Sequence, residues 1–170
     1  RIAYGHTSHG SQIIDGMTGL TTFSKAPKGG SIYRWNRHGG GSDEALALHD
    51  RFMEGDLGNP DRTSWAARTR SYLQGNPSTS VIMWSWCGQV SGASFSDIET
   101  YLHLMSGLER DYPKVAFIYM TGHLDGTGLQ GNLHQRNEQI RKYCRDNNKW
   151  LYDFADIERY DPDGADYLAR

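Results

Sequence analysis

Short apolar runs recur along this chain, and each ends at a glycine or a polar loop. The strongest is 80–86, which reads Ser-Val-Ile-Met-Trp-Ser-Trp and stops before Cys87-Gly88-Gln89. Further runs lie at 2–5, 31–35, 115–120 and 150–154. Runs that are apolar on both faces are typical of buried parallel strands. The pattern therefore predicts five strands, with 80–86 in the centre of the sheet.

Segments with helical periodicity separate these runs. They lie at 11–17, 43–52, 63–73, 96–108 and 133–145. Ser42 is the expected N-cap of the second segment, and Ser96 opens a capping box with Glu99 in the fourth. Strands that alternate with helices predict right-handed crossovers and a sheet covered on both faces. We therefore expect one α/β domain over 1–170, with three α/β/α layers and a five-stranded parallel sheet.

Composition excludes several classes of function. A net charge of -2 offers no basic face for nucleic acid, and no apolar run approaches the roughly 20 residues that span a bilayer. No phosphate-binding loop, dinucleotide motif or zinc-protease motif is present, so we expect neither cofactor nor metal. We interpret Cys87 and Cys144 as two buried thiols, with a disulfide between them as the alternative. The acidic segment 153–163 is expected to be a solvated surface.

A parallel sheet places its ligand crevice beyond the carboxyl ends of its strands. Three loops are expected to meet there: 5–10, 86–89 and 122–126. In the first, Ser8 lies where backbone N–H groups and a helix dipole can stabilise an oxyanion, so it is the candidate nucleophile. Thr7 and Ser11 are alternatives to Ser8. All three hydroxyls could instead simply cap the following helix.

Three histidines lie in the predicted crevice loops: His6, His9 and His123. A neutral imidazole is the usual base for a weak nucleophile, so each is a candidate base. Packing or a surface position is the alternative for any one of them. Because two strand ends contribute them, we expect them to form one site.

Other polar and aromatic residues have more open assignments. Gln89 can supply an oxyanion donor or be an ordinary polar loop residue, and Asp125 can orient a histidine, bind a hydroxyl or simply form an Asp-Gly turn. Asn137 faces inward on its helix, so we expect it to hydrogen-bond a crevice loop. The substrate-binding candidates are Trp35, Trp86, Arg136 and Asn137.

Several of these residues resemble conserved blocks of the SGNH, or GDSL-like, hydrolase superfamily. The segment 5–10, Gly-His-Thr-Ser-His-Gly, resembles its Gly-Asp-Ser block, in a variant that reads Gly-His-x-Ser. Gly88-Gln89 resembles the block whose Asn completes the oxyanion hole, and glycines 39–41 loosely resemble the block whose Gly N–H also serves it. The resemblance implies a flavodoxin-like SGNH-hydrolase fold over nearly the whole chain.

One departure from that superfamily concerns its catalytic Asp and His. In the superfamily they form an Asp-x-x-His motif near the carboxyl end. The corresponding region of this chain contains Asp161 and Asp163, but no histidine follows His134. Either the chain ends before that histidine, or a crevice histidine replaces it, or the site performs other chemistry. The segment 122–126 resembles one in uncharacterised secreted bacterial proteins of this type.

Three functions follow as hypotheses. The first is a serine hydrolase that removes an acyl group from a carbohydrate, with Ser8 as nucleophile, His123 or His6 as base, and Gln89 with the N–H groups of Ser8 and Gly10 as oxyanion donors. The second is a polysaccharide lyase, in which a His or Tyr abstracts a proton next to a uronate carboxylate held by Arg136 or another basic residue. The third is a sugar-binding module that uses Trp35, Trp65 or Trp86 for stacking. We expect a secreted, mature fragment, with a cytoplasmic protein as the alternative.

Overall fold

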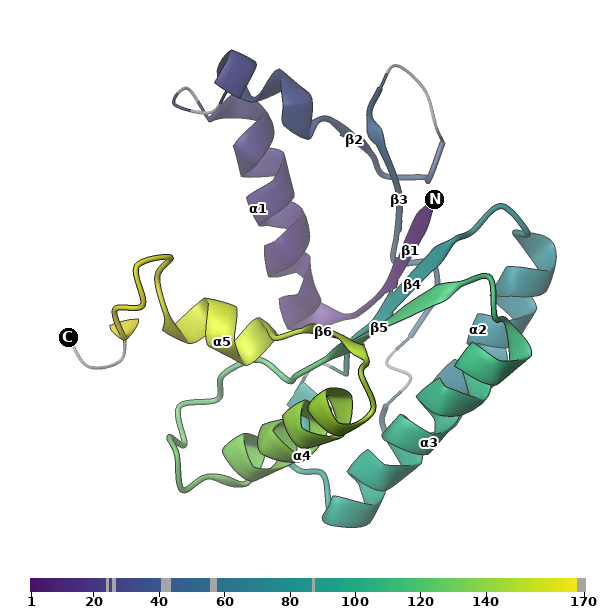
Figure 1. The fold of residues 1–170 in the computed structure, drawn as a ribbon, viewed down its shortest axis with the longest axis vertical. Helices are drawn as coiled ribbons and strands as arrows, with labels where there is room; N and C mark the ends of the chain where they lie inside the picture. The colour runs from purple at the N-terminus through teal and green to yellow at the C-terminus, as the bar shows by residue number, and fades with distance from the viewer. Residues whose placement is uncertain (24, 26, 41–43, 56–57, 87, 168–170) are drawn as a thin grey trace.

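The computed structural model describes residues 1–23, 25, 27–40, 44–55, 58–86 and 88–167. Its strands form one parallel sheet of six in the order β2-β3-β1-β4-β5-β6 (Figure 1). The strands are β1 (Ile2–Gly5), β2 (Trp35–Asn36), β3 (Leu46–Asp50), β4 (Val81–Trp84), β5 (Ala116–Met120) and β6 (Trp150–Tyr152). The α-helices are α1 (Ser11–Thr22), α2 (Ser64–Gly75), α3 (Phe95–Asp111), α4 (Asn132–Asp146) and α5 (Phe154–Arg159). Three 3-10 helices are η1 (Ser8–Gly10), η2 (Pro27–Tyr33) and η3 (Gly88–Val90).

The strand order determines where a ligand can bind. Without β2, which only extends the sheet beyond β3, the order is that of a doubly wound sheet, in which the chain reverses direction across the sheet at the first strand. The reversal lies between β1 and β4, which pair from Ile2 opposite Val81 to Gly5 opposite Trp84. The loops after these two strands therefore begin side by side at the carboxyl edge.

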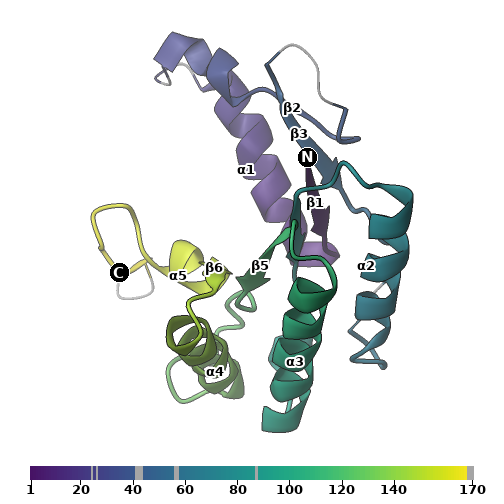
Figure 2. The same ribbon diagram turned by 45° about the vertical axis from the view of Figure 1, so that its right-hand side comes forward.

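Helices cover both faces of the sheet. Side chains of α2, α3 and α4 pack in a large apolar cluster with Ala3, Ile82 and Trp84, whereas Ile14 of α1 and Phe154 of α5 pack on the other face. Figures 1 and 2 show α2–α4 on one side of the strands and α1 and α5 on the other. The expected three layers are therefore confirmed. The sheet itself has six strands rather than five.

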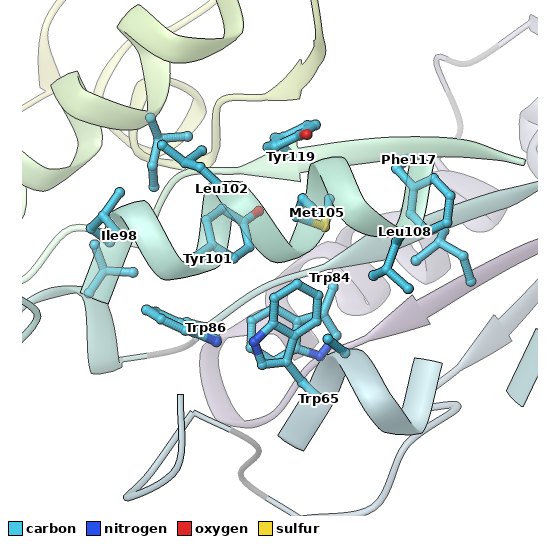
Figure 3. Close-up of a cluster of buried hydrophobic side chains, with 14 of the residues drawn as sticks. Trp65, Trp84, Trp86, Ile98, Tyr101, Leu102, Met105, Leu108, Phe117 and Tyr119 are labelled. Carbon is cyan, nitrogen blue, oxygen red and sulfur yellow. The ribbon is translucent and has the colours of Figure 1, made fainter. Parts of the chain in front are cut away.

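Aromatic rings fill the centre of the larger cluster, as Figure 3 shows. Trp65 of α2 stacks on Trp84 with ring centroids 4.6 Å apart, and Trp86 lies 5.5 Å from Tyr101 of α3. All four side chains are buried. Large aromatic side chains bury the most apolar area per residue, so this cluster anchors the helix layer to the central strands.

Three predicted helices are confirmed with small changes of boundary. The inward residues expected for α2 and α4 are buried, including Trp65, Leu73, Leu133 and Ile140. In α3 the capping box is formed by Ser94 and Asp97 rather than by Ser96 and Glu99. The Ser94 hydroxyl accepts from the Asp97 N–H, and the Asp97 carboxylate accepts from the Ser94 N–H, so the helix begins two residues earlier than predicted.

The helix predicted over 43–52 is wrong, because its central part is strand β3. Leu46 and Leu48 are separated by one residue, and Leu48 is buried opposite Ile2 of β1. Ala and Leu favour helices when considered alone, but pairing on both edges, with β1 and β2, outweighs that local preference. The expected cap Ser42 and the first helical residue Asp43 lie outside the described residues.

The strand predicted over 31–35 is also largely wrong. The 3-10 helix η2 continues to Tyr33, and β2 contains only Trp35 and Asn36. Ile32 and Tyr33, which suggested a buried strand, are exposed. The last predicted strand, 150–154, ends at Tyr152, since Asp153 caps α5 by accepting from the Asp156 N–H.

The acidic segment near the carboxyl end is built into the fold. Asp153 accepts two hydrogen bonds from the Arg141 guanidinium, at 2.7 and 2.8 Å, and one from the Thr121 hydroxyl. These contacts connect α4, the end of β5 and the start of α5, so this part of the segment is structural rather than merely solvated. Within the described ranges, no helix combines the length and the apolar character needed to cross a bilayer.

Candidate active site

The loops after β1, β4 and β5 meet at the carboxyl edge of the sheet, as predicted. The imidazole of His9, in the first loop, stacks on that of His123 in the third, with ring centroids 3.7 Å apart and planes inclined by 18°. A Cβ atom on Gly88 of the second loop would lie 4.0 Å from His123 Nε2. The Ser85 N–H also donates to the Gly5 carbonyl oxygen. Three segments distant in sequence thus form one rim.

A fourth loop, which follows β3, joins this rim. A Cβ atom on Gly58 would lie 3.0 Å from the Trp86 ring and 3.2 Å from Gln89 Cγ, so a larger residue here would crowd both side chains. The Arg62 guanidinium lies 5.2 Å from the Trp86 ring centroid and donates to the Gly58 carbonyl oxygen. The chain from 58 to 62 therefore closes over the side of Gln89.

Ser8 occupies a tight turn between β1 and α1. Its φ is +38°, a left-handed value that costs energy for a residue with a Cβ atom, and its side chain is exposed. Strained backbone at the turn from a strand into a helix is typical of residues held in place for function. The residue before the turn, Thr7, makes no capping hydrogen bond through its side chain, and the N-cap of α1 is Gly10. Helix capping therefore does not explain the hydroxyl at position 8.

Two backbone donors expected to serve an oxyanion are used elsewhere. The Gly10 N–H donates to the Thr7 carbonyl oxygen at 3.0 Å, inside the turn itself. The Gly39 N–H donates to the carbonyl oxygens of Asn36 and Leu48, and Gly39 packs against Arg1 beside the opposite end of β1. The N–H groups of Gly10 and Gly39 are therefore not available to an oxyanion, which corrects the roles predicted for these two glycines. Gly41 lies outside the described residues.

His6 is buried below the turn and cannot contact a substrate. Its Nε2 lies 2.7 Å from Asp50 Oδ1, and the two side chains are only 1% and 5% exposed. The Tyr4 ring stacks on the imidazole at 4.4 Å. The prediction of His6 as the alternative base for the Ser8 hydroxyl is therefore wrong. Asp50 was not predicted as its partner, because the segment around Asp50 was predicted to be a helix.

His123 has the hydrogen bonding that a general base needs. Its Nδ1 lies 2.7 Å from the Leu124 carbonyl oxygen, which can only accept, so Nδ1 carries the proton in the neutral ring. Nε2 then bears the free lone pair. That atom is buried and has no hydrogen-bond partner among the described residues. A buried, unpaired imidazole nitrogen facing the Gly88 loop is poised to accept a proton.

The loop that orients His123 is itself anchored. The Leu124 N–H donates to Glu158 Oε2 of α5 at 2.6 Å, so a carboxylate holds the peptide whose carbonyl orients the imidazole. In sequence alone, nothing distinguishes Glu158 from its acidic neighbours. Asp125, the predicted orienting residue, instead accepts from the N–H and hydroxyl of Thr127 at 3.0 and 2.6 Å. It forms the turn that was its alternative interpretation.

Asn137 has the structural role predicted for it. Its Oδ1 accepts from the Gly122 N–H at 2.8 Å and its Nδ2 donates to the Gly122 carbonyl oxygen at 3.1 Å, which ties α4 to the residue before His123. Both polar ends of the amide are thus used internally, so Asn137 positions the loop and does not bind substrate.

Replacing Asn137 with alanine is expected to lower the free energy of unfolding by about 2–4 kcal/mol, because two buried backbone groups of Gly122 lose their partner. Urea denaturation of the variant measures this. Gln135→Ala, an exposed change on the same helix, is the matched control and should stay within about 0.5 kcal/mol of wild type. Equal midpoints for the two variants would contradict the role of Asn137.

The other substrate-binding candidates are either buried or lie away from the rim. Trp86 and Trp65 are 4% and 0% exposed and belong to the core, so neither can stack on a sugar. The Arg136 guanidinium lies 5.6 Å from the Phe95 ring, in the groove between α3 and α4. Trp35 is partly buried against the cluster on the α1 face. No exposed aromatic side chain was therefore correctly assigned to the rim.

Among the described residues, neither the cysteine nor the acidic groups form a second reactive site. Cys144 is a buried free thiol on α4, and burial raises its pKa to about 12, so it stays protonated and unreactive. Cys87, and with it the possible disulfide, lies outside the described residues. In the part of the chain that the structure describes, no three His, Cys, Asp or Glu side chains are placed to hold a metal ion.

Comparison with known proteins leaves this site to be interpreted from its geometry. No family model, curated protein or solved structure matches the chain. The strongest features are the exposed Ser8 in its strained turn and the buried, unpaired Nε2 of His123, connected through the stacked ring of His9.

Proposed function

We propose that this protein is a serine-type hydrolase of the SGNH kind that cleaves an ester of a carbohydrate. The observation that carries the proposal is the contact between the rings of His9 and His123. His9 belongs to the same loop as Ser8, which among the described rim residues is the only one with both a hydroxyl and a left-handed φ. His123 contributes a ring nitrogen that has no hydrogen-bond partner among the described residues. The strand order and the Gly-His-x-Ser segment support the same assignment.

In this mechanism the Ser8 hydroxyl attacks the ester carbonyl carbon while its proton passes to His123 Nε2. The proton then moves to the departing sugar oxygen as the C–O bond breaks, which leaves an acyl group on Ser8. The same nitrogen takes a proton from a water molecule, whose oxygen attacks the acyl carbonyl. The imidazolium then gives that proton to the Ser8 oxygen as the acyl C–O bond breaks, which releases the acid and restores Ser8. The Leu124 carbonyl takes the orienting role that an Asp has in a full triad, since it fixes the tautomer of His123.

We assign the developing oxyanion to the Ser8 N–H and the side-chain amide of Gln89, with no contribution from Gly10. The carbohydrate half of the proposal is supported by the polar character of the rim. Ser8 and His9 are exposed, Gln89 is partly exposed, and Arg62 lies beside them. Polar hydrogen-bonding groups suit a hydroxyl-rich alcohol better than a lipid chain.

The other two hypotheses are not favoured. A lyase that relies on Arg136 requires this side chain beside the base, whereas it packs on Phe95 in another groove. A binding module that stacks sugars on Trp65 or Trp86 requires exposed rings, and both are buried.

A fluorophosphonate reagent and an acetylated polysaccharide test the proposal together. We expect the reagent to label one residue, which peptide mass spectrometry identifies as Ser8, and the protein to release acetate. Pre-labelled protein is the control and should release none. Absence of both labelling and acetate release would refute the hydrolase, and a new ultraviolet absorbance from an unsaturated sugar would point to a lyase.

A further inference from the structure

A buried polar pair lies directly below the turn that carries Ser8. His6 Nε2 and Asp50 Oδ1 are 2.7 Å apart, and the second carboxylate oxygen lies 3.2 Å from Arg37 Nε. Removing a carboxylate and an imidazole from water is costly, and an apolar pair of similar size often stabilises a fold at least as well. The pair is therefore poorly explained by stability alone.

The pair also joins two loops of the rim. His6 follows β1 and leads into the turn at Ser8, and Asp50 is the last residue of β3. Strand β1 lies between β3 and β4. The His6–Asp50 pair therefore connects the first loop to β3, and the hydrogen bond from the Ser85 N–H to the Gly5 carbonyl oxygen connects it to the loop after β4.

Packing around the imidazole transmits this hold to the turn. The Tyr4 ring covers one side of His6, and the Tyr4 hydroxyl donates to the Gly10 carbonyl oxygen at 3.4 Å. A Cβ atom on Gly10 would lie 2.5 Å from His6 Cβ and 2.6 Å from the imidazole, so the turn rests directly on this side chain. A displaced imidazole would therefore displace the chain from Ser8 to Gly10.

We propose that the His6–Asp50 pair positions the nucleophile, by holding the Ser8 turn in its left-handed conformation. This inference rests on the proposed hydrolase function, and it makes His6 and Asp50 positioning residues rather than catalytic ones. The strained φ of +38° at Ser8 needs such support, because an unsupported serine relaxes to ordinary backbone values.

Asp50→Asn is the first test, because the amide keeps the size of the carboxylate and removes its charge. We expect kcat for a small ester to fall about 10–100-fold with KM within about threefold of wild type, since a displacement near 1 Å costs rates of that order. The rate of labelling by the fluorophosphonate should fall in parallel. Asp111→Asn, which removes a carboxylate from an exposed pair with Arg70, is the matched control and should leave both rates unchanged.

A double variant separates positioning from stability. His6→Leu combined with Asp50→Leu replaces the pair by apolar side chains, so we expect thermal stability near that of wild type but kcat as low as in Asp50→Asn. A double variant with wild-type kcat would overturn the proposal. So would single variants whose loss of activity follows only the fraction of unfolded protein.

Amide hydrogen exchange tests the pair without relying on catalysis. The Gly10 and Ser11 N–H groups donate to carbonyl oxygens within the turn, so both should exchange at least about tenfold faster in Asp50→Asn than in Asp111→Asn. An inactive wild-type protein would refute the proposed hydrolase, whereas unchanged exchange at these two amides would refute the positioning role.

Discussion

Ser8→Ala is expected to lower esterase activity by about 10³-fold or more and to abolish labelling by a fluorophosphonate. The variant keeps the backbone of the turn but removes the only atom that can form the acyl intermediate, so both the chemical step and the covalent label are lost. The measurements are kcat/KM on a small ester and intact-protein mass after labelling. Because the Ser8 side chain is exposed, the free energy of unfolding should change by less than about 0.5 kcal/mol.

Two neighbouring hydroxyls provide controls for Ser8. Thr7→Val and Ser11→Ala remove the alternatives that the sequence leaves open, and both variants should retain activity within about threefold and still be labelled at Ser8. Ser8→Gly should be as inactive as Ser8→Ala, yet no less stable, because glycine accepts a φ of +38° without strain. Activity that is lost in Ser11→Ala but kept in Ser8→Ala would show that Ser11, and not Ser8, is the nucleophile.

His123→Gln is expected to lower kcat by about 10²–10⁴-fold, the usual contribution of a positioned general base. The glutamine amide fills a similar space but cannot take up the proton of the Ser8 hydroxyl. The measurements are kcat on a small ester and the rate of labelling by the fluorophosphonate, and both should fall in His123→Gln.

Two other histidines separate base catalysis from general effects of losing an imidazole. His103→Gln, an exposed change on α3, should leave kcat unaltered. His9→Ala removes the ring that stacks on His123 and should reduce kcat less than His123→Gln does, because stacking orients the base but accepts no proton. If His9→Ala lowered kcat further than His123→Gln, His9 rather than His123 would be the base.

Much of the sheet and the meeting of its loops was predictable from local pattern. The apolar runs at β1, β4 and β5 each bury side chains on both faces, as is typical of covered parallel strands, and Leu151 and Tyr152 of β6 are partly buried in the two clusters. The carboxyl ends of parallel strands share one edge, so the contact between His9 and His123 could be anticipated although over a hundred residues separate them.

Local pattern failed where pairing outweighed propensity. The segment Ala45-Leu46-Ala47-Leu48 is rich in helix formers, and nothing inside it shows that β1 and β2 will pair with it on both edges. Because that strand was missed, so was Asp50 at its end, the partner of His6. The same limit applies to Glu158, whose contact with the Leu124 N–H depends on how α5 packs.

The sequence by itself determined the fold class, the central strands, and the loops of Ser8, Gln89 and His123 that meet at the rim. Each depends on periodicity or on a rule that holds for any parallel sheet. Only the tertiary structure decided which histidine has a free nitrogen. Nε2 of the buried His6 contacts Asp50, whereas His123 contacts the Leu124 carbonyl oxygen through Nδ1 and its Nε2 has no partner among the described residues. Hydrogen-bond partners that lie many residues away determine the role of a side chain, and their positions are known only when the chain has folded.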